Sequence, residues 1–146
     1  MRKHISILLF VAFALTLSGC GDGKLRTEPV TGTITYKGEP LVGASVAFSP
    51  KVAGEGHGGF ARTDSNGFYR LQTTLGHVDA GTTPGEYYVT ITKVKLVGTG
   101  RFTNDGSGRT EEEVPVSVIP EKYSSAEGGL TATVVRGRNV FNFDLE

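Results

Sequence analysis

The sequence predicts an all-β protein, in which a single antiparallel β-sandwich of about seven strands follows an N-terminal signal peptide and a short tether; a small closed barrel is the alternative. Short runs of alternating apolar and polar residues, rich in Val, Thr, Phe and Tyr, recur between turn signals that contain Gly, Pro or Asn. Glycine makes up 21 of the 146 residues, and no segment shows a helical period. This length also favours one domain.

The first two strands are predicted at residues 30–36 and 44–49. Apolar residues alternate with threonines in the first segment (VTGTITY), and with serine and alanine in the second (ASVAFS). Residues 37–40 (KGEP) break the pattern, because glycine permits unusual φ values and proline cannot donate to a strand ladder. We therefore expect a hairpin-like unit with one apolar face.

The remaining strands are expected to follow in order. They are predicted at residues 60–63, 68–73, 86–97, 114–119, 130–134 and 139–145. Residues 64–67 (DSNG) form a turn signal, whereas the Gly-rich residues 51–59 and 98–113 are expected as connections, the second as a mobile loop.

The apolar residues that alternate along these strands should point to one side and form a common core. Tyr123 is expected over one end of it. The predicted core residues are Val30, Ile34, Val46, Phe48, Tyr69, Leu71, Tyr87, Val89, Ile91, Leu130, Val134, Phe141, Phe143 and Leu145.

The N-terminus has the pattern of a secretory signal. A basic start (MRK) precedes an apolar run of 13 residues at 5–17, which is short for a membrane span of about 20 residues. The run ends in LSGC, which resembles a bacterial lipobox. We expect cleavage between Gly19 and Cys20, so that removal of residues 1–19 leaves 127 of the 146 residues.

Cys20 is the expected site of lipidation. It is the only cysteine of the chain, so an intramolecular disulfide cannot form. Residues 20–28 would then be the lipidated cysteine and a flexible polar tether, and the membrane would be a partner through the lipid. We expect an exported lipoprotein that faces the periplasm or the cell surface. Gly21, rather than aspartate, follows the cysteine and favours the outer membrane.

The charge distribution argues against a nucleic-acid partner. The chain has 15 basic and 15 acidic residues, and removal of Arg2 and Lys3 leaves 13 basic and 15 acidic residues, a net charge of −2. No basic stretch is suited to neutralising phosphates.

Turn and core residues recur with a defined order and spacing from residue 30 onwards. The main segments are V-x-G-x-I at 30–34, G-x-P-L-x-G-A-x-V-x-F at 38–48, A-x-T-D-x-x-G-x-Y-x-L at 61–71, P-G-x-Y-x-V at 84–89 and I-P-x-K-Y at 119–123. This pattern resembles the carboxypeptidase regulatory-like domain, and the whole chain is similar to short bacterial lipoproteins built from one such domain. The resemblance implies a transthyretin-like or Ig-like sandwich at residues 29–146. In the large carboxypeptidases this domain is an accessory to the peptidase, so the resemblance implies no peptidase activity here.

Two functions of different classes remain open. The first is a non-catalytic, lipid-anchored cell-envelope module, binding or structural, with envelope proteins or glycans as partners and no cofactor. The alternative is a metal-dependent or other enzymatic activity centred on the loops of His57 and His77. Neither histidine has the spacing of a known zinc site, and residues 64–67 lack the further oxygen ligands of a calcium loop. We therefore assign no catalytic or metal-ligating residue.

Phe68 and Tyr88 are the predicted binding patch. Both fall in the outward phase of their strands, and the strand pattern allows them to lie near one another. Such a patch would suit a glycan ring or a partner's side chain, whereas the alternative is an aromatic pair that only stabilises the sheet. The Gly-rich residues 51–59 and 98–113 are the other candidate contact surface.

Overall fold

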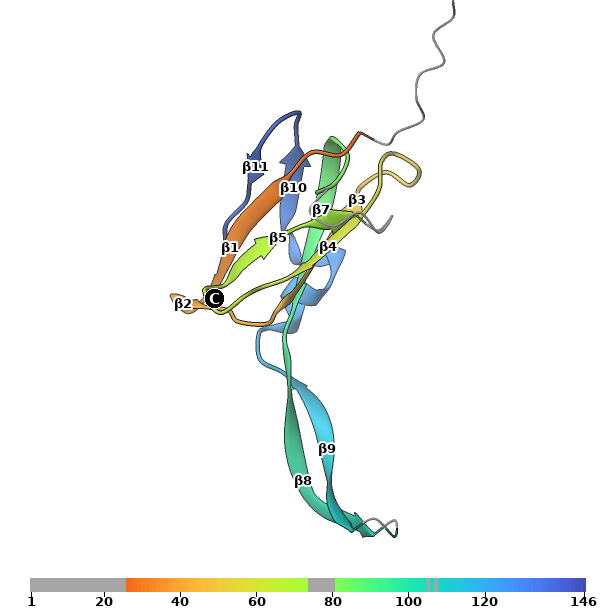
Figure 1. The fold of residues 1–146 in the computed structure, drawn as a ribbon, viewed down its shortest axis with the longest axis vertical. Helices are drawn as coiled ribbons and strands as arrows, with labels where there is room; N and C mark the ends of the chain where they lie inside the picture. The colour runs from red at the N-terminus through yellow and green to blue at the C-terminus, as the bar shows by residue number, and fades with distance from the viewer. Residues whose placement is uncertain (1–25, 74–80, 105, 107) are drawn as a thin grey trace, which may run out of the picture.

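The computed structural model describes residues 26–73, 81–104, 106 and 108–146, and this part of the chain is all-β, as predicted (Figure 1). Two short 3-10 helices, η1 (Glu121–Ser124) and η2 (Ala126–Gly128), are the exceptions among the described residues. No helix in the described ranges is long and apolar enough to span a membrane. The predicted signal peptide, the cleavage site at Gly19 and Cys20, and His77 lie outside the described residues.

The described strands form two five-stranded sheets and a separate two-stranded ribbon. In the first sheet β1 (Val30–Tyr36) pairs with β2 (Glu39–Pro40), β5 (Phe68–Arg70), β11 (Asn139–Val140) and β12 (Phe143–Leu145). The second sheet has the order β10 (Thr131–Val134), β7 (Gly85–Thr92), β3 (Ser45–Pro50), β4 (Gly59–Arg62) and β6 (Gln72–Thr73). The ribbon consists of β8 (Val94–Asn104) and β9 (Arg109–Ser117).

The core contains the residues that the alternating patterns predicted. The buried ones are Val30, Ile34, Val46, Phe48, Tyr69, Leu71, Tyr87, Val89, Ile91, Val134 and Leu145, and Tyr123 is buried with them. Leu130, Phe141 and Phe143 are half-buried against this cluster. The ring of Phe48 in the second sheet lies 6.5 Å from that of Tyr69 in the first and 6.0 Å from those of Phe141 and Tyr87. Aromatic packing therefore joins the two sheets.

The predicted hairpin of the first two strands is wrong. After β1 the chain turns at Lys37 and Gly38, whose φ angles of 54° and 83° suit a two-residue hairpin turn, and pairs β2 with β1. It then crosses to the other sheet, where β3 pairs with β4 and β7. The alternation of apolar residues determines which face of a strand is buried, but it does not determine the neighbouring strand.

The predicted antiparallel pairing is found for most strand pairs but not for all, because β1 pairs in parallel with β11 and β12. The chain reaches β11 from β10 in the other sheet, through a tight connection organised by the buried Asn139. Its Oδ1 accepts from the Val135 amide at 2.9 Å, and its Nδ2 donates to the carbonyls of Val135 and Gly137, both at 2.9 Å. A strand that changes sheets is not bound to the antiparallel direction of a hairpin.

Residues 98–113 are not the predicted mobile loop but lie mostly in β8 and β9. The predicted strand at 86–97 is interrupted at Lys93, and β8 pairs with β9 from Val94 opposite Ser117 to Asn104 opposite Arg109, with an irregularity between Gly98 and Phe102. Figure 1 shows this ribbon projecting from one end of the two-sheet body. The glycines that suggested a loop lie at or near this irregularity and the tip, where backbone freedom is needed.

Glu28, assigned to the tether, is paired with the folded domain. Its amide donates to the carbonyl of Thr82 at 2.7 Å, and its carbonyl accepts from the Thr82 amide at 3.1 Å. Its carboxylate accepts from the Gly137 amide at 2.9 Å. Because Thr82 precedes β7 and the ribbon follows β7, the chain enters the body at one end and the ribbon leaves it at the other (Figure 1).

Candidate functional site

The most distinctive surface is the β8–β9 arm, residues 94–117, which lies outside the core. Every residue described within β8 and β9 is exposed to solvent. An isolated two-stranded ribbon is only marginally stable in water, since it lacks a layer against which to bury its side chains. The arm nevertheless carries a concentration of exposed apolar residues: Val94, Leu96, Val97, Phe102, Val114 and Val116.

These apolar residues lie on both faces of the arm, because directly opposed residues of a ribbon share a face. On one face, the leucine face, Leu96 lies opposite Pro115, with Val94 two residues away along β8. On the other face, the valine face, Val97 lies opposite Val114. Lys95 lies opposite Val116 on that same face. Leu96 is 63% exposed and Val97 is 37% exposed, so neither face is covered within the described chain.

The outer half of the arm is organised by polar contacts. The Thr99 hydroxyl donates to the carbonyl of Glu112 at 3.0 Å, and the Gly100 amide donates to Oε1 of Glu111 at 2.8 Å. The guanidinium of Arg101 lies 3.6 Å from the Glu112 carboxylate. The exposed ion pair contributes at most about 1 kcal/mol, so it orients the outer part of the arm more than it stabilises the fold.

The two outer edges of the arm differ. The edge of β9 carries Pro115, which lacks an amide hydrogen, and three consecutive glutamates at 111–113, and both features oppose the addition of another strand. In the segment of β8 from Val94 to Gly98 the only charged residue is Lys95. Within the described chain β8 pairs only with β9. The edge of β8 is therefore the one suited to pairing.

The structure does not bring Phe68 and Tyr88 together, so the two do not form one patch as expected. Phe68 lies on β5 in the first sheet, and Tyr88 lies on β7 in the second. Each is half-buried and is followed or preceded by buried residues, so the two side chains lie on the outer faces of different sheets. The alternation predicted correctly that both side chains point outward, but alternation does not determine the sheet to which a strand belongs.

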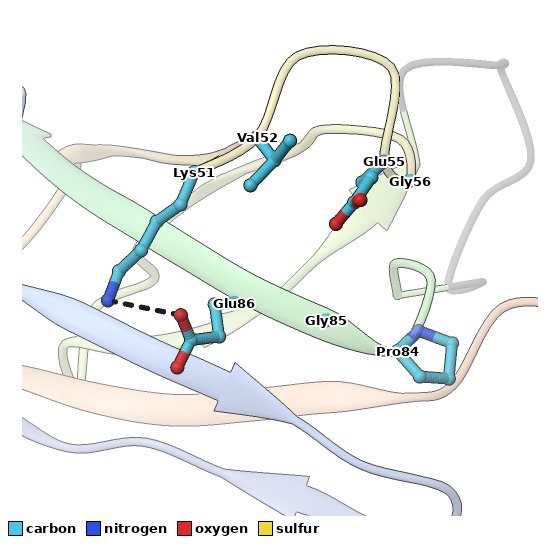
Figure 2. A pocket seen from close by; sticks show the side chains of 7 residues that line it. All are labelled: Lys51, Val52, Glu55, Gly56, Pro84, Gly85 and Glu86. Atoms are coloured by element: carbon cyan, nitrogen blue, oxygen red, sulfur yellow. Dashed lines mark ion pairs between the residues drawn. The ribbon is translucent and has the colours of Figure 1, made fainter.

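A hollow of about 320 Å³ lies beside the start of β7, in the region of the predicted loop at 51–59 (Figure 2). It is lined by Lys51, Val52, Glu55, Gly56, Pro84, Gly85 and Glu86. The Lys51 ammonium lies 3.7 Å from the Glu86 carboxylate, and 5.7 Å from the ring centre of Tyr88. The Lys51 ammonium beside this hollow is thus already paired with Glu86.

His57 is half-buried next to this hollow, and the contacts of its backbone hold its loop to the start of β7. Its amide donates to Oγ1 of Thr83 at 2.9 Å. Its carbonyl accepts from the hydroxyls of Tyr87, at 3.2 Å, and of Thr82. No cluster of three or more His, Cys, Asp or Glu suited to a metal occurs among the residues described. The other histidine of the metal-dependent alternative, His77, lies outside the described residues.

The DSNG segment is a turn, as predicted. Oδ1 of Asp64 accepts from the amides of Asn66 at 2.8 Å and Phe68 at 3.0 Å. Gly67 has a φ of 71°, and its amide donates to the Asp64 carbonyl at 3.1 Å. The aspartate carboxylate is thus used by the backbone of the turn.

Strands at 86–97 and 114–119 and a contact surface at 98–113 were predicted, but the pairing of the arm was missed because glycines and charges at 98–113 suggested a loop. One signal was present: residues 94–97 (VKLV) place apolar side chains in both phases of a strand, and residues 114–116 (VPV) add two valines in one phase and a proline in the other. Such runs are typical of strands that are buried on both faces. In the described chain these segments are exposed on both faces, which makes them the candidate contact surface.

Comparisons with known proteins give little further information. No family model matches the chain, and no curated protein matches it. The solved structure of a 9R-lipoxygenase from Cyanothece PCC8801 is similar over 82% of this chain and 16% of that chain, with 14% sequence identity and a TM-score of 0.40. The chain thus spans about one sixth of that protein, and this similarity is too low to carry an inference.

Proposed function

We propose that the protein is an exported, lipid-anchored, non-catalytic module of the cell envelope, and that it binds another envelope component through the β8–β9 arm. The observation that carries this proposal is the cluster of exposed apolar residues on both faces of a ribbon that leaves the body. Contiguous exposed apolar surface is uncommon on isolated soluble domains and marks interaction sites. Burial in a complex would gain about 25 cal/mol per Å² of apolar area.

The position of the arm fits a contact away from the anchoring membrane. Residues 21–27 separate Cys20 from the paired Glu28, and seven extended residues reach at most about 25 Å. A lipid on Cys20 would hold the Glu28 end of the body near the membrane. The arm leaves from the opposite end, so it would present its apolar faces to other envelope components.

The charged residues near the tip of the arm favour a protein or glycan, and not a lipid surface, as the binding partner. Asn104 and Arg109 close the described strands at the tip, and Glu111 to Glu113 follow on β9. Charged groups are costly to transfer into the hydrocarbon core of a membrane. The apolar residues Val94, Leu96 and Val97 lie closer to the body, where a partner alongside the arm would reach them.

For the domain we propose a transthyretin-like or Ig-like sandwich of the carboxypeptidase regulatory-like type at residues 29–146. This proposal is supported by several residues of the motifs, among which glycines lie in turns and apolar residues lie in the core. Gly38, Gly43 and Gly67 have positive φ angles, and Ile34 and Leu71 are fully buried. Main strands β1, β3, β4, β5–β6, β7, β10 and β11–β12 would account for the seven strands of such a domain.

The proposal is tested by cross-linking the full chain in the envelope of a producing bacterium. We expect the double variant Leu96→Ser/Val114→Ser to lose the cross-linked products of the wild-type protein. Both residues are exposed in the monomer, so the body should remain folded. The matched control is Val135→Ser/Val140→Ser, which removes two valines that are each 56% exposed elsewhere on the surface. If the arm variant kept every product of the control, the arm would not be the contact surface.

A further inference from the structure

We propose that the occupant of the β8 edge is a second copy of this chain, joined by antiparallel pairing of the two β8 strands around Val97. This inference rests on the proposed function of the arm and specifies the partner. The result is a four-stranded sheet with the order β9–β8–β8–β9, in which the two glutamate-rich, proline-containing edges lie outside. A symmetric dimer of this kind uses the same surface on both copies.

A two-fold axis at Val97 determines which residues face each other. Val97 lies opposite Val97 of the second copy, and Leu96 lies opposite Gly98 of the second copy. Lys95 lies opposite Thr99 of the second copy. β8 continues as a strand through residues 99 and 100, although its register with β9 becomes irregular between Gly98 and Phe102. The pairing covers residues 94–100 and ends within this irregular stretch. In this register each residue lies opposite a residue that points to the same side of the sheet. The valine faces of the two copies therefore lie on the same side of the new sheet.

The pairing makes the apolar surface continuous across the dimer. Within one arm Val97 lies directly opposite Val114. The dimer therefore has a row of four valines, from Val114 of one copy, through both Val97 residues, to Val114 of the second copy. Directly opposed side chains in a sheet are about 4.5–5.5 Å apart at Cβ, close enough for β-branched residues to pack.

Charge complementarity selects this register. In each arm Thr99 is next to Glu112 across the ribbon, since its hydroxyl donates to the Glu112 carbonyl at 3.0 Å. Lys95 opposite Thr99 of the second copy is then two strand spacings, about 10 Å, from the backbone of Glu112 of the second copy. Long lysine and glutamate side chains on one face can meet across this distance, and Lys95 would share this exposed carboxylate with Arg101, which lies 3.6 Å from it. A register centred on Leu96 would place Lys95 opposite Val97 of the second copy and further from Glu112.

Cysteine substitution tests the register directly. The full chain, purified in detergent with Cys20→Ser to remove its only native thiol, carries Val97→Cys. We expect a disulfide-linked dimer on mild oxidation, because the two introduced thiols lie on directly opposed residues. The matched control is Thr103→Cys, on the same exposed strand but outside the paired segment. Equal cross-linking at both positions, or none at position 97, would overturn the proposed pairing.

Charge reversal tests the same contact without a new thiol. We expect Lys95→Glu to weaken the dimer about fivefold in sedimentation experiments, and Lys95→Glu/Glu112→Lys to restore it. A wild-type chain that is monomeric in sedimentation would overturn the proposed dimer. The arm would still be supported as a contact surface if Leu96→Ser/Val114→Ser lost the products cross-linked in the envelope. Envelope products unchanged in that variant would instead count against the proposed function itself.

Discussion

Val97 of β8 lies directly opposite Val114 of β9, and both side chains are exposed, at 37% and 40%. In a sheet that covers a core, such a pair of β-branched residues would be buried. Here the pair belongs to a ribbon that carries similar apolar residues on its other face. The structure thus combines a body with a buried core and an arm whose apolar residues are exposed.

The body depends on the packing of Phe48 between the two sheets. We expect Phe48→Ala to lower the free energy of unfolding by about 3–5 kcal/mol, because it leaves a cavity among the rings of Tyr69, Tyr87 and Phe141. Urea denaturation followed by circular dichroism measures this loss. Phe60→Ala, which removes a ring that is 50% exposed, is the control and should change the stability by less than about 1 kcal/mol.

Asn139 should stabilise the connection between the two sheets through its side chain. Asn139→Ala removes three side-chain hydrogen bonds with Val135 and Gly137, and we expect a loss of about 2–3 kcal/mol in the free energy of unfolding. Asn104→Ala, in the exposed arm, should stay within about 0.5 kcal/mol of wild type. An equal effect of the two substitutions in urea denaturation would contradict this role.

Tyr69 should make the protein sensitive to alkaline pH. Burial raises the pKa of its phenol above the ordinary value of 10.0, because the charged phenolate is poorly solvated in the core. The unfolded chain therefore loses this proton first, and the stability contribution present at neutral pH is lost as the pH rises above about 10.

Tyr69→Phe tests this dependence. The variant loses the hydrogen bond from the phenol to the Phe141 carbonyl, 2.8 Å long, and should be about 1–2 kcal/mol less stable at neutral pH. Its stability should then fall less steeply than that of the wild type between about pH 9 and pH 12. A decline as steep as in the wild type would show that another group controls alkaline unfolding.

The lipid anchor is tested by metabolic labelling. We expect wild-type protein to incorporate radioactive palmitate and Cys20→Ala to incorporate none, because the thiol is the acceptor of the lipid. The precursor of the variant should also keep residues 1–19. Gly23→Ala, which leaves the lipobox intact, is the control. If the Cys20→Ala variant still incorporated palmitate, Cys20 would not be the lipid acceptor, and the proposed membrane anchor would be contradicted.

The sequence predicted local structure well because side-chain alternation reports burial. Ile34, Val46 and Tyr87 were expected in the core and are buried there. The alternation contains no information about which strands are neighbours, so the parallel pairing of β1 with β12 and the separation of β1 from β3 were not foreseen. The same gap explains why Phe68 and Tyr88 were expected together although they lie in different sheets.

The arm could not be predicted for a different reason. Strands were expected at 86–97 and 114–119, but the arm buries no side chain in the body, so no burial pattern distinguishes residues 98–113 from a polar loop. Their pairing depends on contacts between residues distant in the chain, such as Val94 with Ser117. The available signal was that apolar residues occur on both faces of the expected strands. This indicates two similar faces and not one buried face opposite a polar one.

Removal of the arm tests the central claim most directly. The Val118 amide donates to the Lys93 carbonyl at 2.8 Å, so the two ends of the arm are adjacent and a two-residue Asn-Gly turn can replace residues 94–117. We predict that this variant keeps the strand-rich circular dichroism spectrum and a thermal midpoint within a few degrees of wild type, but loses all cross-linked products in the envelope. An unfolded variant, or one that retains those products, would contradict an arm that serves binding and not the stability of the body.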